Sequence, residues 1–394
     1  MIKKVLIDKA NRTYQFPPDL FSFLPDNEKP SLIKKTELID LGKFNWNIPY
    51  SQNEKITPES LAPASTKKLD ELRETISDWI YELHKIRINP KKEIYIGGSV
   101  SQILFATALA YIEPSDVIFV PKLGLPTYRK VITACGGEAV SYDISLKSNW
   151  SPDFTKLSTR LGHVARMLFL NTPHNPTGYT LKQTELEQLI ALASKENIAV
   201  INDTAYQSIV DKPESSLIGT KGGKRIGIEL YSFSYQFGLP KLPFGFAVGS
   251  KDLIEGLTRT SSLFAQHIPQ YYVDMALEGI RKFPSDNIAE IKKQFIKSKN
   301  EAEKLFELFN IESLSTSTYP FIWGKLAKRK SSQKFATQLF RKYRILSIPG
   351  TVFGNNGEGF IRLSLTASAS SYQEAYKRVK KRLLLTDKNE QIND

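Results

Sequence analysis

Apolar segments that alternate with helical patterns dominate the chain from about residue 69 to residue 250. The strand-like segments are residues 93–98, 116–121, 138–144, 165–173, 198–206 and 228–234. Several of them are continuously apolar, which is expected of parallel strands buried on both faces. Apolar residues recur at helical spacing in 69–86, 99–112 and 181–197. Alternating strands and helices predict an α/β fold with a parallel or mixed central sheet.

The pattern changes near residue 286, where a long helical segment begins. Strand-like segments follow it, and a helix over residues 371–385 closes the chain. We therefore expect an N-terminal arm over residues 1–50 that belongs to the small domain, a large domain over 51–285, and a small α+β domain over 286–394.

Composition is ordinary for a globular protein. The 394 residues are 41% hydrophobic and 24% charged, and no apolar run approaches the roughly 20 residues that cross a bilayer. A single cysteine, Cys135, excludes an intramolecular disulfide and suits a reducing compartment. The histidines and this cysteine lack the spacing of metal ligands. We expect a cytoplasmic protein with no metal and no membrane partner.

The net charge of +13 raises the question of a nucleic-acid partner. Basic residues gather only at 325–330, 341–344 and 377–382, and no recognised nucleic-acid-binding motif accompanies them. The last two segments lie in predicted amphipathic helices, where a solvated charged face is common. The sequence therefore predicts no nucleic-acid partner.

Polar or glycine-rich segments stand at the carboxyl ends of four predicted strands. These are the glycine turn at 97–98, the NPTG segment at 175–178, Asp203, and residues 232–235. Ligands of open α/β sheets collect at such ends. Their convergence predicts a ligand site.

The motifs in these segments resemble those of the class I/II aminotransferases, which are fold type I enzymes dependent on pyridoxal 5'-phosphate (PLP). They are NTPHNPTG (171–178), VINDTAY (200–206), SFSYQFGLP with GFAVG (232–249), and PGTVFGNNGEGFIRLS (349–364). The resemblance runs from about residue 40 to 385. It implies a large domain with a mixed, mostly parallel seven-stranded sheet, a smaller α+β domain, a homodimer, and an amino acid or keto acid ligand.

The resemblance also implies roles for individual residues. Asp203 matches the carboxylate that pairs with the pyridine nitrogen of PLP or of pyridoxamine 5'-phosphate (PMP), and keeps the ring protonated. Tyr206 and Asn175 match the groups that hydrogen-bond to the ring oxygen. Arg362 matches the arginine that holds the substrate α-carboxylate, for which a planar guanidinium is suited.

The phosphate of the cofactor has its own matching residues. Gly98, Ser99 and Val100 occupy the turn and helix start that receive it, and Ser232 matches a hydroxyl ligand. Each residue alone also fits a turn, a helix cap or a salt bridge. Together, in the family's order, they predict a PLP or PMP pocket.

The sequence departs from the family pattern at the cofactor lysine. With SFS and GFAVG fixing the register, Tyr235 stands where the Schiff-base lysine is expected. Pro243 stands where the phosphate arginine is expected, and Lys241 replaces a glycine. Leu125 takes the place of the stacking aromatic residue, and Pro63 that of a tyrosine lent by the neighbouring subunit.

Tyrosine has an unperturbed pKa of about 10 and can move a proton, but it cannot form an imine. A first interpretation is an enzyme that binds PLP or PMP without a covalent bond and uses Tyr235 as its acid–base group. A second is a non-catalytic relative that binds a ligand through Arg362 or serves a structural or regulatory partner. A third is a transaminase in which Lys241 replaces the missing lysine. Lys241 or Lys122 could also supply charge to the phosphate.

Overall fold

The computed structural model describes residues 21–24, 30, 34, 37–44, 57–159, 163–210, 215–239, 244–264, 267–283, 286–314, 319–327 and 331–391. Lys241 and Pro243 lie outside these residues. The largest sheet has the order β2-β8-β7-β6-β5-β3-β4. In that order its strands are β2 (Ile94–Gly97), β8 (Gly245–Gly249), β7 (Gly227–Ser232), β6 (Ala199–Asp203), β5 (Ala165–Asn171), β3 (Val117–Pro121) and β4 (Glu138–Tyr142).

This sheet is mixed and mostly parallel. Strands β7, β6, β5, β3 and β4 run parallel to one another, whereas β8 is antiparallel to both β2 and β7. Each strand coincides with a segment predicted from the apolar pattern, except β8. The prediction of an α/β fold with a seven-stranded sheet is confirmed.

Helices cover both faces of the sheet. Helices α2 (Val100–Tyr111), α3 (Pro126–Ala134) and α8 (Lys251–Ser261) pack on one face. Helices α1 (Thr66–His84), α9 (Gln270–Arg281) and α5 (Gln183–Lys195) cover the other, which also carries the short α6 (Gly223–Ile226) and α7 (Phe233–Phe237). Because both faces are covered, the central strands carry apolar side chains on both sides.

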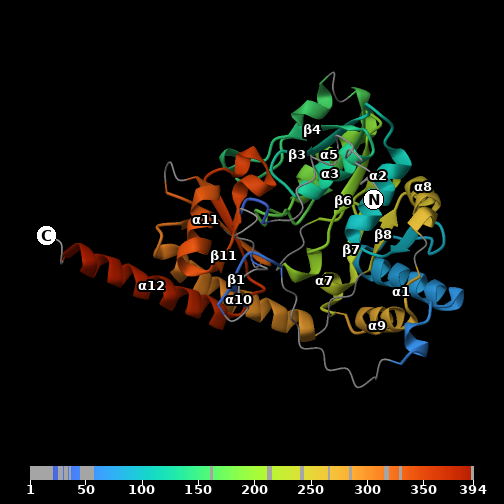
Figure 1. Ribbon diagram of the computed structural model, residues 1–394. Helices are drawn as coiled ribbons and strands as arrows, with labels where there is room; N and C mark the ends of the chain where they lie inside the picture. Colours follow the sequence, from blue (N-terminus) through green and yellow to red (C-terminus); the bar gives the residue numbers. More distant parts are fainter. Residues whose placement is uncertain are drawn as a thin grey trace, which may run out of the picture.

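A second region lies beside this sheet, on the side where Figure 1 shows α10, α11 and α12. Its four-stranded sheet has the order β12-β13-β10-β9, with strands β12 (Ile348–Pro349), β13 (Phe360–Ser364), β10 (Phe321–Lys325) and β9 (Glu312–Ser313). A two-stranded parallel sheet joins β1 (Ile39–Asp40) to β11 (Ile345–Leu346). Residues 39–41 therefore pack with the C-terminal region, and the assignment of the whole arm to the small domain stays a prediction.

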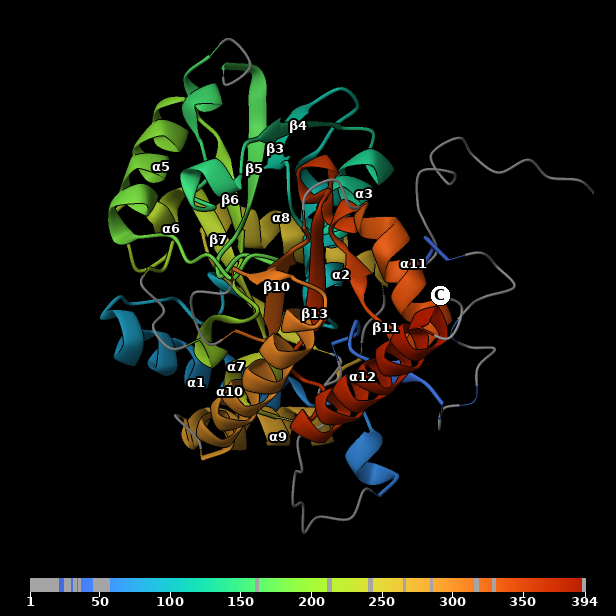
Figure 2. The ribbon, with the colours of Figure 1, turned by 90° about the vertical axis from the view of Figure 1, so that its left-hand side faces the viewer.

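Three helices complete this region: α10 (Asp286–Glu307), α11 (Ser332–Tyr343) and α12 (Ala369–Gln391). The domain boundary predicted at residues 285 and 286 coincides with the start of α10 and stays a prediction. Figure 1 shows α12 extending away from the body of the molecule towards the C-terminus, and Figure 2 shows α12 beside α10. Among the described residues, no helix is long and apolar enough to cross a membrane.

Candidate active site

Three neighbouring strands bring the predicted phosphate residues together. Gly97 of β2 pairs with Gly245 of β8, and Gly245 pairs with Ser232 of β7. The predicted turn at Gly98 therefore lies one strand away from Ser232. A Cβ atom on Gly245 would lie 2.5 Å from the Tyr231 carbonyl oxygen, so this close approach requires glycine.

The helix that follows β2 begins at this edge of the sheet. Ser99 is the N-cap of α2, and its hydroxyl accepts a hydrogen bond from the Gln102 N–H at 3.1 Å. Val100 is the first residue of α2. A helix start carries unpaired N–H groups and a partial positive charge, so it suits a phosphate. Gly98, Ser99, Val100 and Ser232 thus lie at one edge of the sheet, and their role in binding a phosphate stays a prediction.

Asp203 ends β6 and is buried beneath this edge. Its carboxylate accepts hydrogen bonds from the Ala205 N–H at 3.1 Å and from the Tyr128 hydroxyl at 2.9 Å. Burial raises the pKa of Asp203, and the two hydrogen bonds oppose that shift. A buried carboxylate without a described cation is suited to a protonated ring nitrogen.

The NPTG segment is fixed to the same edge by Asn171, the last residue of β5. The Asn171 amide donates to the Asp203 carbonyl oxygen at 2.8 Å, and its carbonyl oxygen accepts from the Asn175 N–H at 2.8 Å. Burial raises the pKa of Tyr206, and a hydrogen bond from Asn175 opposes this rise. Asn175 and Tyr206 therefore lie within bonding reach of each other, as a shared ring-oxygen ligand requires.

Arg362 reaches this cluster from β13 of the second region. Its guanidinium donates to the Asn175 side-chain oxygen at 3.0 Å and to the Gly42 carbonyl oxygen at 3.1 Å. Arg362 is 3% exposed and also packs over the rings of Phe321 and Phe353, at 4.0 and 4.9 Å from their centroids.

No carboxylate in the described part of the chain matches the charge of Arg362. No described Asp or Glu lies within ion-pair distance of it, and its Nε has no hydrogen-bond partner. Burial lowers the pKa of Arg362 to about 10, so the side chain stays protonated near neutral pH. A buried, protonated guanidinium with a free N–H indicates a place for an anionic ligand.

Tyr235 follows Ser232 in the first turn of α7 and stacks on Tyr206. The two ring centroids lie 5.4 Å apart with an interplanar angle of 13°. Phe44 packs against Tyr235 at 4.7 Å and against Tyr206 at 5.7 Å. Burial raises the pKa of Tyr235 to about 12, and the charge of Asp203 adds to the shift. The phenol is therefore neutral near pH 7.

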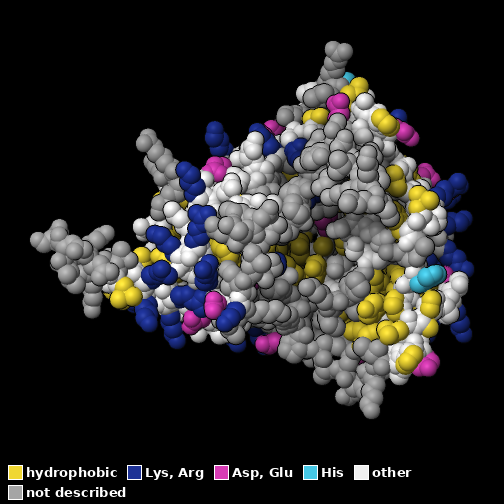
Figure 3. Space-filling view, viewed as in Figure 1, with side chains coloured by type: hydrophobic (Ala, Val, Ile, Leu, Met, Phe, Trp, Pro, Cys, Tyr) yellow, Lys and Arg dark blue, Asp and Glu magenta, His cyan; other side chains and the backbone are white. Residues whose placement is uncertain are grey.

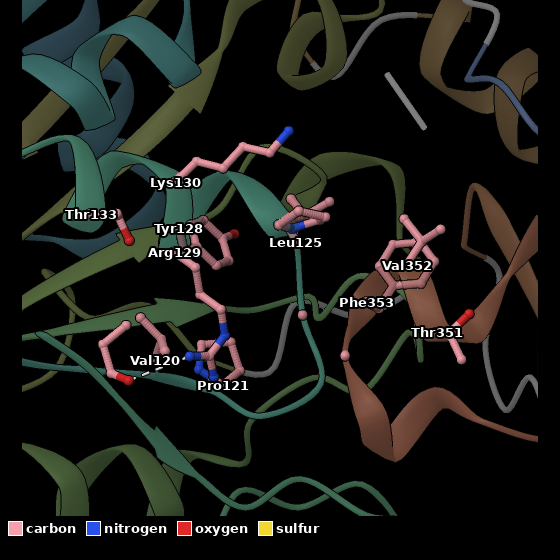
Figure 4. A pocket seen from close by; sticks show the side chains of 14 residues that line it. Val120, Pro121, Leu125, Tyr128, Arg129, Lys130, Thr133, Thr351, Val352 and Phe353 are labelled. Carbon is pink, nitrogen blue, oxygen red and sulfur yellow. Dashed lines mark hydrogen bonds between the residues drawn. The ribbon is translucent and has the colours of Figure 1, made fainter. Parts of the chain in front are cut away.

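Leu125 lines a cavity of about 410 Å³ together with Tyr128, which bonds to Asp203, and Phe353, which packs on Arg362. Figure 4 shows Leu125 and Tyr128 on one side of the cavity and Val352 and Phe353 on the other. Leu125 is also the N-cap of α3, without a side-chain hydrogen bond. It lies one residue before a proline, as the stacking position does in the resemblance, but it offers only an aliphatic surface.

The remaining sequence candidates lie elsewhere or pair with other groups. Lys122 forms an ion pair with Asp143 at 3.2 Å, which leaves less of its charge for a phosphate. Pro63 bridges to Pro269 in an antiparallel pair.

Sequence analysis missed several residues of the site. They are Gly42, Phe44, Tyr128, Asn171, Tyr319 and Phe321. Only Asn171 carried a usable signal, because it begins the NTPHNPTG motif at a strand end. Tyr128 and Asp203 are 75 residues apart, and nothing in the sequence predicts that contact.

Comparison with known proteins places this geometry in a class. The site combines a carboxylate, an amide–phenol pair and an arginine at the carboxyl edge of a sheet with the fold type I arrangement. The family model for aminotransferase class I and II matches residues 58–379. The chain belongs to this family.

Similar proteins cover nearly the whole chain. The LL-diaminopimelate aminotransferase of Halothermothrix orenii is 28% identical over 389 residues, which are 95% of this chain and 98% of that protein. The enzyme of the same name from Moorella thermoacetica is 25% identical, covering 95% and 98%. The substrate-bound BacF structure from Bacillus subtilis has a TM-score of 0.86 at 23% identity, covering 95% of this chain and 98% of that one.

The cofactor of this family is PLP, or PMP in its amino form. The donor set fits the cofactor ring: a buried carboxylate, a phenol and an amide lie at one edge of the sheet. The N–H groups at the start of α2 fit its phosphate. The segment from β7 to α7 carries Tyr235 at the position of the cofactor lysine. A phenol cannot form the imine that a lysine amine forms with the aldehyde of PLP.

Proposed function

We propose that this protein binds PLP or PMP without a covalent bond and acts on an amino acid or keto acid whose α-carboxylate pairs with Arg362. The buried guanidinium is the observation that carries the proposal, because its Nε lacks a partner and no described carboxylate neutralises it. A ligand carboxylate would supply the missing hydrogen-bond acceptor for Nε and the missing negative charge. When bound, the cofactor would supply an electron sink for chemistry at the amino-bearing carbon.

The residues of the chain would divide the remaining work. Asp203 would hold a proton on the ring nitrogen, and the Tyr128 hydroxyl and Ala205 N–H would orient its carboxylate. Asn175 would connect the two ligands, because its side chain bonds Arg362 and lies beside Tyr206. This link fixes the carboxylate end relative to the ring.

Tyr235 would act as a proton donor and not as an attachment point. Its pKa of about 12 keeps the proton on the phenol near pH 7, so the group gives up a proton only to a strongly basic atom. General acid–base catalysis contributes about 10²–10⁴ in rate. A chain that has this group but no attachment lysine would work from added PMP more readily than from PLP.

The names of the relatives supply the first substrate to try. LL-diaminopimelate and its keto acid partner would be tested first, followed by other amino and keto acids. The alternative is a ligand-binding protein without turnover. It predicts binding of the same molecules with no transfer of the amino group.

Isothermal titration with PMP and then a keto acid tests the proposal in wild-type, Arg362→Lys and Arg362→Gln proteins. We expect Arg362→Gln to lower keto acid affinity about 10–100-fold, because a charge-assisted hydrogen bond contributes about 1.5–3 kcal/mol. Arg362→Lys should retain part of the affinity, and PMP binding should persist in both variants. Equal keto acid affinity in all three proteins would exclude Arg362 as the carboxylate ligand.

We also propose that the protein is a homodimer. Leu61 of η4 (Glu59–Leu61) and Leu263 of η8 (Ser262–Phe264) are 50% and 73% exposed. Figure 3 shows hydrophobic side chains on the face of the molecule where Figure 1 labels α9. Exposed apolar surface of this kind is suited to a subunit contact. Sedimentation equilibrium of wild-type protein and Leu263→Asp tests it, with a shift to monomer expected in the variant.

A further inference from the structure

A second cavity of about 410 Å³ is lined in part by Gln236 of α7 and shares no lining residue with the candidate active site. It is bounded by the end of α1, the turn η7 (Gln207–Ile209), residues 215–220, α7 and the first turns of α10. Figures 1 and 2 both show α1, α7 and α10 in the same part of the molecule. A volume of this size suits a small metabolite.

Two polar atoms in the lining lack hydrogen-bond partners. Gln236 is 1% exposed, and its amide nitrogen donates to the Ser208 hydroxyl, but its Oε1 has no partner. The Nε2 of His84 has none either. Buried polar groups are nearly always paired, so two unpaired atoms in one cavity indicate a missing partner.

Three hydroxyl groups of the lining donate to other acceptors and not to Gln236. Ser215 donates to the Leu181 carbonyl oxygen at 2.7 Å, Thr220 to the Ser216 carbonyl oxygen at 2.7 Å, and Ser216 to Glu229 at 2.9 Å. Each of these protons is already used. A ligand with a donor of its own could therefore bond to the Gln236 oxygen.

The charge of the lining favours an anion. Lys292 is the lining residue with a permanent charge, and the described lining holds no Asp or Glu. No described carboxylate lies within ion-pair distance of Lys292. Burial lowers the pKa of His84, so its ring is neutral near pH 7 and Nε2 can either donate or accept.

We propose that this cavity binds a small hydroxycarboxylate. Its hydroxyl would donate to the Oε1 of Gln236, its carboxylate would pair with Lys292, and the Nε2 of His84 would bond one of its oxygens. An amine cation is disfavoured because the described lining offers it no carboxylate.

This cavity does not depend on the function proposed above, but a ligand in it would influence the candidate active site. Gln236 and Tyr235 are consecutive residues of α7, and Tyr235 stacks on Tyr206. A ligand held by Gln236 would fix the helix that places Tyr235. The cavity is therefore a regulatory site by position.

Nuclear magnetic resonance of the His84 ring tests the proposal on the full chain. The chain has four histidines, so the His84 ring nitrogens can be assigned by comparison with His84→Gln. All of these proteins also carry the substitution Arg362→Gln, which removes the other predicted carboxylate site. We expect L-malate to shift the His84 signal saturably at roughly millimolar concentration. Succinate lacks the hydroxyl and should bind several-fold more weakly.

Lys292→Gln should weaken malate binding about tenfold or more, because it removes the charged partner. Lys293→Gln is the matched control: it removes the same charge from the next residue, which is 68% exposed, and should leave binding unchanged. Three results would overturn the proposal: no shift of His84 with malate, equal affinity for succinate and malate, or the same affinity in Lys292→Gln and Lys293→Gln. The first would mean that water alone fills the cavity.

Discussion

Two buried carboxylates on adjacent strands, Glu229 of β7 and Asp203 of β6, are held in different ways. Glu229 is fully buried and accepts hydrogen bonds from the Leu217 N–H at 2.6 Å, the Asn202 amide at 3.0 Å, the Ser216 hydroxyl at 2.9 Å and the Tyr231 hydroxyl at 2.5 Å. Asp203 accepts two described hydrogen bonds, and burial raises its pKa.

The difference separates a structural charge from a functional one. Four donors replace the water that Glu229 loses, so its charge is satisfied within the fold. Asp203 and Arg362 are each buried with bonding capacity left over, and both lie at the carboxyl edge of the sheet. Incomplete satisfaction at an edge where ligands bind indicates that a ligand completes the set.

Replacing Glu229 should give the largest loss of stability. We expect Glu229→Leu to lower the free energy of unfolding by about 4 kcal/mol, because the Leu217 N–H and the Asn202 amide are left without acceptors at about 1–3 kcal/mol each. Glu229→Gln should cost less than half as much, since the hydroxyls of Ser216 and Tyr231 can turn to accept. Urea unfolding measures both, and equal losses would show that the hydrogen bonds glutamine can keep do not account for the stability of this network.

His174 is a third buried titratable group, and its two ring nitrogens both have suitable hydrogen-bond partners only when the ring is neutral. Its Nε2 lies 2.9 Å from the Leu123 carbonyl oxygen and so must donate, while Nδ1, at 2.8 Å from the Thr177 hydroxyl, accepts. Burial lowers the pKa of His174 to about 4. The stability it contributes is therefore complete above its unfolded pKa of about 6.5 and is lost as the pH falls towards 4.

The loss of unfolding free energy caused by His174 should reach about 3 kcal/mol at pH values below its folded pKa. Unfolding in urea at a series of pH values, for wild-type protein and His174→Gln, measures it as the difference between the two pH profiles. Parallel profiles would mean that the imidazole is not kept neutral by its surroundings.

Asp203→Asn should have the smallest effect on the fold and a clear effect on the ligand. Because burial raises the pKa of Asp203, its deprotonation costs stability as the pH rises through that pKa, and the amide avoids this cost. We expect the free energy of unfolding without cofactor to change by less than about 1 kcal/mol. PMP affinity should fall about tenfold or more, because the ring nitrogen loses a charged partner. A stability loss as large as that of Glu229→Leu would remove the distinction between the two carboxylates.

The sequence predicts more of the fold than of the site, and particular residues show why. The buried strands are continuous apolar runs, so their positions follow from local pattern. Asn175, Asp203, Tyr206 and Arg362 were found because motifs mark them, and the structure brings them together. Phe44, Tyr128 and Tyr319 were missed, since each reaches the site through tertiary packing that leaves no local signal.

The β7–α7 segment shows the other limit of the sequence. Residues 228–234 were expected to form a strand, but β7 ends at Ser232 and α7 begins at Phe233. The N-cap hydroxyl of Ser232 accepts from the Tyr235 N–H, which turns the chain into the helix. Tertiary packing against Tyr206 then orients the Tyr235 ring.

The most direct test of the central claim compares wild-type protein with Tyr235→Lys after addition of PLP. The absorption spectrum is recorded, borohydride is added, and peptides are analysed by mass spectrometry. The account predicts no lysine peptide carrying the reduced cofactor in wild-type protein, and such a peptide at position 235, with a visible absorption band, in Tyr235→Lys. A reduced cofactor on Lys241 of the wild-type protein would contradict it, because the chain would then have an attachment lysine of its own.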